Sequence, residues 1–293
     1  MSSGNVVNIS IALYRNHFHS YLLLAAQSML WYLLPIYGWA KATQLQALIA
    51  RQAYSELIEQ PETLSALRQQ LRGYTWDFWA LHVLVWLAGT TINFGLSAVG
   101  ASIILPMTIV IAAVPNNFTL FLLVQALQVV LTLVTWGVIL WFYSRFIVAE
   151  LSLAVEPRAH SWSALVRSWR LTPKWNFRIQ LAIGSMFLVT VPLFTVAFFV
   201  PLLISLITAA SLPNEFADSS TTVGLFFLLF FGVFLLLLLV IVVLGIPLWQ
   251  ALKAALYFDL LNRREGRNLQ LRTLPQDLPV PAPSEQLINP DAV

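Results

Sequence analysis

The sequence predicts an all-α membrane protein, a polytopic helical bundle of about six membrane helices. Three observations lead to this prediction. The chain is 59% hydrophobic and only 10% charged, whereas soluble domains carry about a quarter charged residues. Residues 225–246 contain no side chain that can form a hydrogen bond, and roughly 20 apolar residues are enough to cross a bilayer. A short amphipathic segment also precedes an apolar block three times along the chain.

The amphipathic segment is clearest at residues 161–171. Formed as a helix, it would carry an apolar stripe of Trp162, Leu165, Val166 and Trp169. Its basic residues lie largely off this stripe, as is typical of a helix that lies flat at the membrane interface. Fainter copies occur at 62–72 and within a polar leader at 1–19. We therefore predict three helical hairpins, each preceded by an interfacial amphipathic helix.

The predicted membrane domain covers residues 20–262. Its six helices are expected at 20–35, 39–55, 77–112, 119–150, 177–210 and 222–258. The segment 77–112 would be about 54 Å long as one helix, which exceeds the roughly 30 Å hydrocarbon core. It is therefore expected to tilt, to protrude or to break, and a break is expected at 95–102, ahead of Pro106. Residues 263–293 contain five prolines among polar residues, which predicts a disordered cytoplasmic tail.

The first predicted hairpin leaves two alternatives open, because segment 39–55 contains Lys41, Gln44 and Gln46. In one, this segment is a membrane helix that is half buried against its neighbours. In the other it is not a membrane element, and 20–35 is then a single span with the N-terminus outside.

Lys and Arg residues are confined to a few segments of the chain. None lies between Arg72 and Arg145, and none between Arg178 and Lys253. Cytoplasmic loops collect these residues, so both termini are predicted to be cytoplasmic in a bacterial-type cell membrane. Another internal membrane is the alternative. The net charge of +3 does not suggest a nucleic-acid partner, and the absence of cysteine excludes disulfides and thiolate chemistry.

Two tryptophan–cation pairs mark predicted helix ends. Trp141 and Trp249 each stand four residues before a cation, Arg145 and Lys253 respectively. A tryptophan at headgroup depth with a cation one turn further on is typical of an interface anchor. Arg145 and Glu150 are five residues apart and do not share a helix face, so any ion pair would join different helices.

A basic cluster around segment 161–171 is the first candidate site. We expect it to contact anionic lipid headgroups; the alternative is ordinary enrichment of cations on the cytoplasmic side. The candidate lipid-surface residues are Trp162, Arg167, Trp169, Arg170, Lys174 and Arg178.

Four polar residues inside the predicted spans form the second candidate set. His82, Asn93, Gln125 and Gln128 are expected to make polar contacts between helices. The alternatives are a functional role for His82 as an ionisable group in a membrane, and a polar path along the two glutamines. No catalytic, cofactor-binding or metal-binding residues are predicted, because the sequence has no His-x-Glu motif, no carboxylate pair within a span and no phosphate-binding glycine loop.

Two stretches carry a resemblance to a known family. RFIVAELSLAVEPRAHSWSALVRSWRLT, which starts at Arg145, and ALYFDLLNRREG, which starts at Ala255, resemble bacterial integral membrane proteins related to the membrane domain of glycerophosphoryl diester phosphodiesterases. The resemblance implies about six helices with both termini cytoplasmic. It implies the membrane module alone, since the chain has no room for the catalytic barrel.

The leading hypothesis is a non-catalytic scaffold or accessory module that contacts membrane lipids, or an unidentified protein partner, at the cytoplasmic face. The alternative is a transporter or channel for a lipid-like or small uncharged solute. Few acids or bases lie in the predicted spans, which argues against ion-coupled transport. A cavity lined by Asn93, Gln125 and Gln128 would favour the alternative, and a sealed apolar bundle would count against it.

Overall fold

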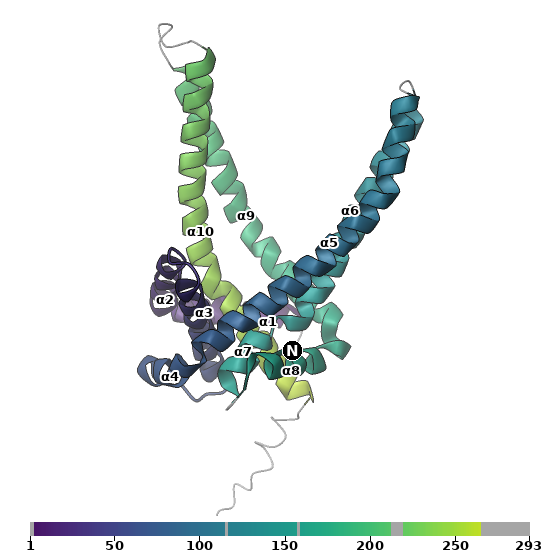
Figure 1. The fold of residues 1–293 in the computed structure, drawn as a ribbon. Coiled ribbons are helices and arrows are strands. Elements are labelled where there is room, and N and C mark those ends of the chain that lie inside the picture. Colours follow the sequence, from purple (N-terminus) through teal and green to yellow (C-terminus); the bar gives the residue numbers. More distant parts are fainter. Residues whose placement is uncertain (1–2, 115–116, 157–158, 212–218, 265–293) are drawn as a thin grey trace, which may run out of the picture.

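Two long helical arms rise from a base of shorter helices and form a V (Figure 1). This computed structural model describes residues 3–114, 117–156, 159–211 and 219–264, and every regular element in them is helical. The helices of the base are α1 (Ser3–Asn16), α2 (Phe18–Trp31), α3 (Tyr37–Leu57), α4 (Leu64–Leu71), α7 (Ala149–Val155) and α8 (Ser161–Leu171). The arms are α5 (Thr75–Ala113) with α6 (Phe118–Phe146), and α9 (Asn176–Ala210) with α10 (Ser219–Arg264).

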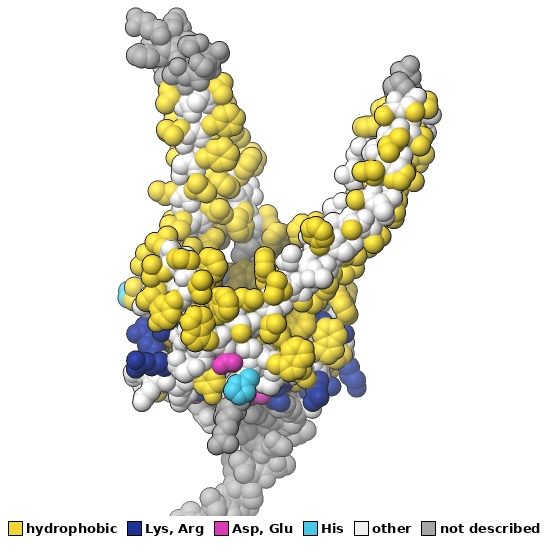
Figure 2. Space-filling model, in the orientation of Figure 1, with side chains coloured by type: hydrophobic (Ala, Val, Ile, Leu, Met, Phe, Trp, Pro, Cys, Tyr) yellow, Lys and Arg dark blue, Asp and Glu magenta, His cyan; other side chains and the backbone are white. Residues whose placement is uncertain are grey.

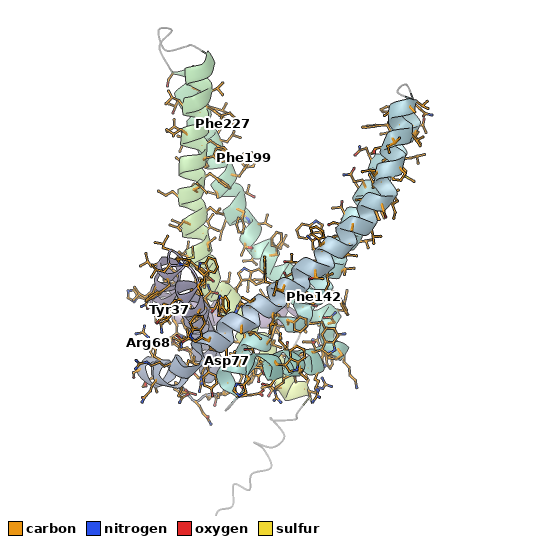
Figure 3. The ribbon with its side chains drawn as sticks, viewed as in Figure 1. Tyr37, Arg68, Asp77, Phe142, Phe199 and Phe227 are labelled. Carbon is orange, nitrogen blue, oxygen red and sulfur yellow. The ribbon has the colours of Figure 1, made fainter. Side chains whose placement is uncertain are left out.

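The arms contain four segments long and apolar enough to cross a membrane. They are Leu64–Ala113, Phe118–Val155, Pro173–Ala210 and Thr222–Arg264. At most 17% of the most apolar 18-residue window of any segment is buried within the chain. Side chains such as Phe199 and Phe227 project from the α9/α10 arm (Figure 3), and the Lys and Arg side chains in view gather at the base (Figure 2). These features fit a multi-pass membrane protein whose arms stand in lipid.

The prediction of six spans in three hairpins is not confirmed. The first pair of helices, α2 and α3, packs side by side within the base. α2 has 14 residues, or about 21 Å of helix, which is short of the hydrocarbon thickness. α3 is largely buried in protein, where Gln44 Nε2 donates a hydrogen bond to the Leu71 carbonyl. The Lys41 ammonium donates to Gln44 Oε1 within the same helix, so polar side chains of α3 find partners inside the protein.

The base has its own core of tightly packed small residues. α3 presents alanines that are fully buried: Ala40, Ala42, Ala47, Ala50 and Ala53. These small side chains let several helices pack closely around α3, among them α10, where the rings of Tyr54 and Tyr257 are 5.5 Å apart. α1, which lies in the predicted leader, packs against α9 and α10 with Val6 and Val7 buried. The N-terminal helix is thus part of the base.

Two predictions about the α5/α6 arm differ from the structure: a break within α5 and the end of α6. α5 runs unbroken through residues 95–102 and through Pro106, so the expected break is wrong. Glycine and proline are tolerated in membrane helices, where hydrocarbon offers the backbone no other hydrogen-bond partner. The predicted helix 119–150 ends at Phe146, and α7 follows as a separate helix. Most of the predicted tail, from residue 265 onward, lies outside the described residues.

We expect Gly38→Ala to destabilise the base, because a Cβ at Gly38 would lie 2.1 Å from the Trp31 carbonyl oxygen and 2.7 Å from Leu34 Cβ. Overpacking of this kind costs about 1–3 kcal/mol, so thermal unfolding in detergent should occur several degrees lower. Gly4→Ala is the matched control, since a Cβ there meets no atom within 4 Å. Equal melting temperatures for the two variants would contradict the close approach at Gly38.

Candidate functional site

Hydroxyl groups and small residues attach α8 to the base. Its buried face consists of Ser161, Ala164, Leu165, Ser168 and Leu171. The Ser168 hydroxyl donates to the Arg145 carbonyl at 2.7 Å. The Ser161 hydroxyl donates to the Asp77 carboxylate at 3.1 Å, and the Ser161 backbone N–H points to the same oxygen at 3.4 Å. Asp77 thus ties the start of α5 to the start of α8 (Figure 3).

Because of this attachment, the residues of the apolar stripe predicted for α8 do not all face the same way. Leu165 faces the protein, while Trp162 is 70% exposed and Trp169 is 42% exposed. Arg170 is exposed beside them. The outward face of α8 therefore combines two aromatic side chains with a cation, a combination suited to the headgroup region of a bilayer.

Two grooves flank α8 and share Trp162, Val166 and Arg170. One, of about 430 Å³, lies between α8 and the α5/α6 arm and is almost entirely apolar, with Phe142 and Phe146 in its wall. The other, of about 690 Å³, is lined by Arg167, Arg170 and Arg264. An apolar groove and a basic groove thus lie on the two sides of one helix.

The basic residues of the cluster have different surroundings. Arg167 forms an ion pair with Glu156, which also accepts a hydrogen bond from the Tyr257 hydroxyl at 3.0 Å. The Arg178 guanidinium lies 5.5 Å from the centre of the Trp175 ring. Arg170 and Lys174 are exposed and form no ion pair with any residue that the structure describes. These two cations are the ones free to meet a lipid headgroup.

The predicted anchors separate into two kinds. The guanidinium carbon of Arg145 lies 5.3 Å from the Trp141 ring centre and 4.7 Å from that of Trp169, and the two rings meet edge to face. The Arg145 Nε and Nη1 atoms are buried and have no hydrogen-bond partner among the described residues, so the role of Arg145 as an interface anchor stays a prediction. Lys253 instead turns inward and forms an ion pair with Glu150, while Trp249 lines a cavity between the arms. These two are not arranged as the lipid-facing pair that the sequence predicts.

A cluster of polar groups lies where the two arms meet. The Glu150 side chain is 4% exposed and forms its ion pair with Lys253 of α10. Gln250 Nε2 donates to Glu150 Oε1 at 3.3 Å, and His82 Nε2 of α5 lies 3.9 Å from Oε2. His82 Nδ1 lies 2.8 Å from the Phe78 carbonyl, so the ring is oriented from both sides. The sequence predicts that any ion pair of Glu150 joins different helices. Glu150 does pair with another helix, and its partner there is Lys253.

A cavity of about 370 Å³ opens beside this cluster, with His82, Glu150 and Lys253 in its wall together with Trp86, Tyr143 and Trp249. The buried charge differs from the sequence-based expectation that the membrane segments hold almost none. Glu150 is an acid within AELSLA, and its apolar neighbours are the signal that could have indicated burial.

A groove distinct from the two beside α8, of about 690 Å³, runs along the α5/α6 arm. It shares Tyr143 with the cavity between the arms. Its polar lining residues are Thr90, Asn93, Ser97, Gln128, Thr132, Thr135 and Tyr143. The hydroxyls of Thr132 and Thr135 donate to carbonyls of their own helix, at 2.8 and 2.9 Å. The side-chain amides of Asn93 and Gln128 have no hydrogen-bond partner among the described residues.

The four polar residues predicted to make contacts between helices therefore have different surroundings. His82 alone faces a charged group on another helix. Asn93 and Gln128 line the groove, and Gln125 is exposed outside it. An amide without a partner in an apolar medium costs several kcal/mol, so the groove is a site where the protein needs a polar neighbour.

Within the described residues, no group of three or more His, Asp or Glu could hold a metal ion. Comparisons with protein-family models, with curated proteins and with solved structures found no match for this chain.

We expect Glu150→Leu to destabilise the protein by about 3 kcal/mol, because it leaves the partly buried Lys253 charge without its partner. The double variant Glu150→Leu with Lys253→Met should recover much of this loss. Chemical unfolding in mild detergent, followed by far-ultraviolet circular dichroism, measures both. Additive losses in the double variant would show that the two side chains are not coupled.

Proposed function

We propose that this chain is a non-catalytic, multi-pass protein of a bacterial-type cell membrane, with both termini in the cytoplasm. Its role is that of a scaffold or accessory module that contacts anionic lipid at the cytoplasmic face. The single observation that carries this proposal is the outward face of α8, where two exposed tryptophans lie beside Arg170, a cation that has no ion-pair partner among the described residues.

The orientation follows from the distribution of charge. The described N-terminal and C-terminal ends both lie at the base, and the base also holds the Lys and Arg side chains (Figure 2). Cations are retained on the cytoplasmic side during membrane insertion. The same orientation is what the resemblance to the phosphodiesterase membrane domains implies.

The chemistry of α8 fits a lipid with an anionic headgroup. Arg170 borders both grooves, so a phosphate bound to it can have Arg264 on the basic side while an acyl chain enters the groove lined by Phe142 and Phe146. Lys174 lies one turn beyond and adds positive charge. Cytoplasmic leaflets carry negative lipid, and each cation near such a surface contributes about 1 kcal/mol.

We expect the double variant Arg170→Ala with Lys174→Ala to bind anionic phospholipid on the order of tenfold more weakly, since two surface cations are lost. Native mass spectrometry of the detergent-purified full chain, titrated with phosphatidylglycerol or phosphatidylcholine, measures retained lipid. Arg167 is left intact because its ion pair with Glu156 belongs to the base.

The matched control is Arg68→Ala with Arg72→Ala, which removes the same charge from exposed positions on α4 and the turn after it. The control should retain phosphatidylglycerol as the unmodified chain does. Equal loss in both double variants would mean that net charge, and not α8, decides the binding.

A further inference from the structure

The groove along the α5/α6 arm places amide groups where only hydrocarbon surrounds the protein. Asn93 and Gln128 lie in segments whose apolar windows are at most 6% buried within the chain. Hydrocarbon can neither donate nor accept a hydrogen bond. An occupant of the groove that carries hydrogen-bonding groups would therefore satisfy both amides at once.

The groove lies between α5 and α6, has both polar and apolar lining residues, and is open on its outer side. Most of its lining residues are exposed in the described structure, so an occupant stays in contact with the bilayer along its length. Polar lining residues recur along α6 from Gln128 through Thr132 and Thr135 to Tyr143, which is about 22 Å of helix, compared with roughly 30 Å for the hydrocarbon core. Polar groups therefore recur over a length close to that of the hydrocarbon core.

The lower end of the groove reaches charged groups. Tyr143 lines both the groove and the cavity between the arms, where His82, Glu150 and Lys253 meet. The His82 side chain is 38% exposed and that of Lys253 is 21% exposed, whereas Glu150 is covered. Positive and hydrogen-bonding groups are therefore the accessible ones, and they suit a phosphate.

We propose that this groove binds the headgroup of a phospholipid and lets it pass between the leaflets while the acyl chains stay in the bilayer. A phospholipid matches each feature, because its headgroup satisfies the amides, its chains occupy the open side and its phosphate fits the cavity end. A transmembrane helix of a second copy would satisfy the amides but would leave the charged end unused. The proposal does not depend on lipid contact by α8.

Filling the groove is the first test. Gly100 lines it, and a Cβ there meets no atom within 4 Å, so Gly100→Leu adds apolar bulk without displacing a neighbour. Gly95→Leu is the matched control, because Gly95 has equally open surroundings on the same helix but does not line the groove.

Removing the amides is the second test. Asn93→Leu with Gln128→Leu takes both hydrogen-bonding groups from the groove, and leucine favours the membrane so that folding is preserved. Gln125→Leu is the control, since Gln125 is an exposed amide of the same helix outside the groove.

The full chain is reconstituted into phosphatidylcholine vesicles containing a trace of headgroup-labelled fluorescent phospholipid, and external dithionite reports transfer between leaflets. We expect transfer well above that of protein-free vesicles. Gly100→Leu and the double amide variant should slow it on the order of tenfold, as expected for the loss of two hydrogen bonds, and both controls should keep the unmodified rate.

Transfer no faster than in protein-free vesicles would overturn the proposal, as would equal rates for the groove variants and their controls. Single-molecule photobleaching in the same vesicles counts subunits. Subunit association that the groove variants abolish, without lipid transfer in any sample, would assign the groove to a second copy of the chain instead.

Discussion

The buried carboxylate of Glu150 is the constraint on which the arrangement of the arms depends. It lies on α7 and is met by Lys253 and Gln250 from α10 and by His82 from α5. A buried carboxylate is stable only when its charge is paired and its oxygens accept hydrogen bonds. Both arms supply those partners, so the vertex of the V is fixed at this point (Figure 1).

Above the vertex, nothing draws the two arms together. In water, hairpins this apolar would collapse against each other, but lipid tails are as apolar as leucine and remove that driving force. The most apolar windows of the arm segments are at most 17% buried within the chain, as suits helices that face lipid along most of their length.

The base helices are shorter or more polar than the arm helices, and they pack against one another instead of facing lipid. Alanines let several helices pack closely around α3, and hydroxyl groups attach α8 to the carbonyl of Arg145. Since α8 is held by its small and hydroxyl residues, its tryptophans are left facing outward. The proposed lipid contact on α8 then lies at the base of the α5/α6 arm, whereas the proposed headgroup groove runs up the arm from Tyr143, on a separate surface.

Local properties of the sequence determined the helical class, the long apolar segments and the segment 161–171, which coincides with α8. Apolar length and the positions of Lys and Arg are read along the chain and need no knowledge of packing. The same reasoning predicted six spans, whereas four segments are long and apolar enough to cross a membrane, because the apolar character of 20–35 cannot distinguish a helix in lipid from one packed in the base.

Only the tertiary structure decided which polar groups meet. Glu150 and Lys253 are 103 residues apart, and no spacing along the chain brings them together. Likewise, Gln125 and Gln128 are neighbours on one helix, yet only Gln128 enters the groove. The rotation of each helix about its axis and the place where helices cross decide such partners, and both depend on contacts between segments far apart in the sequence.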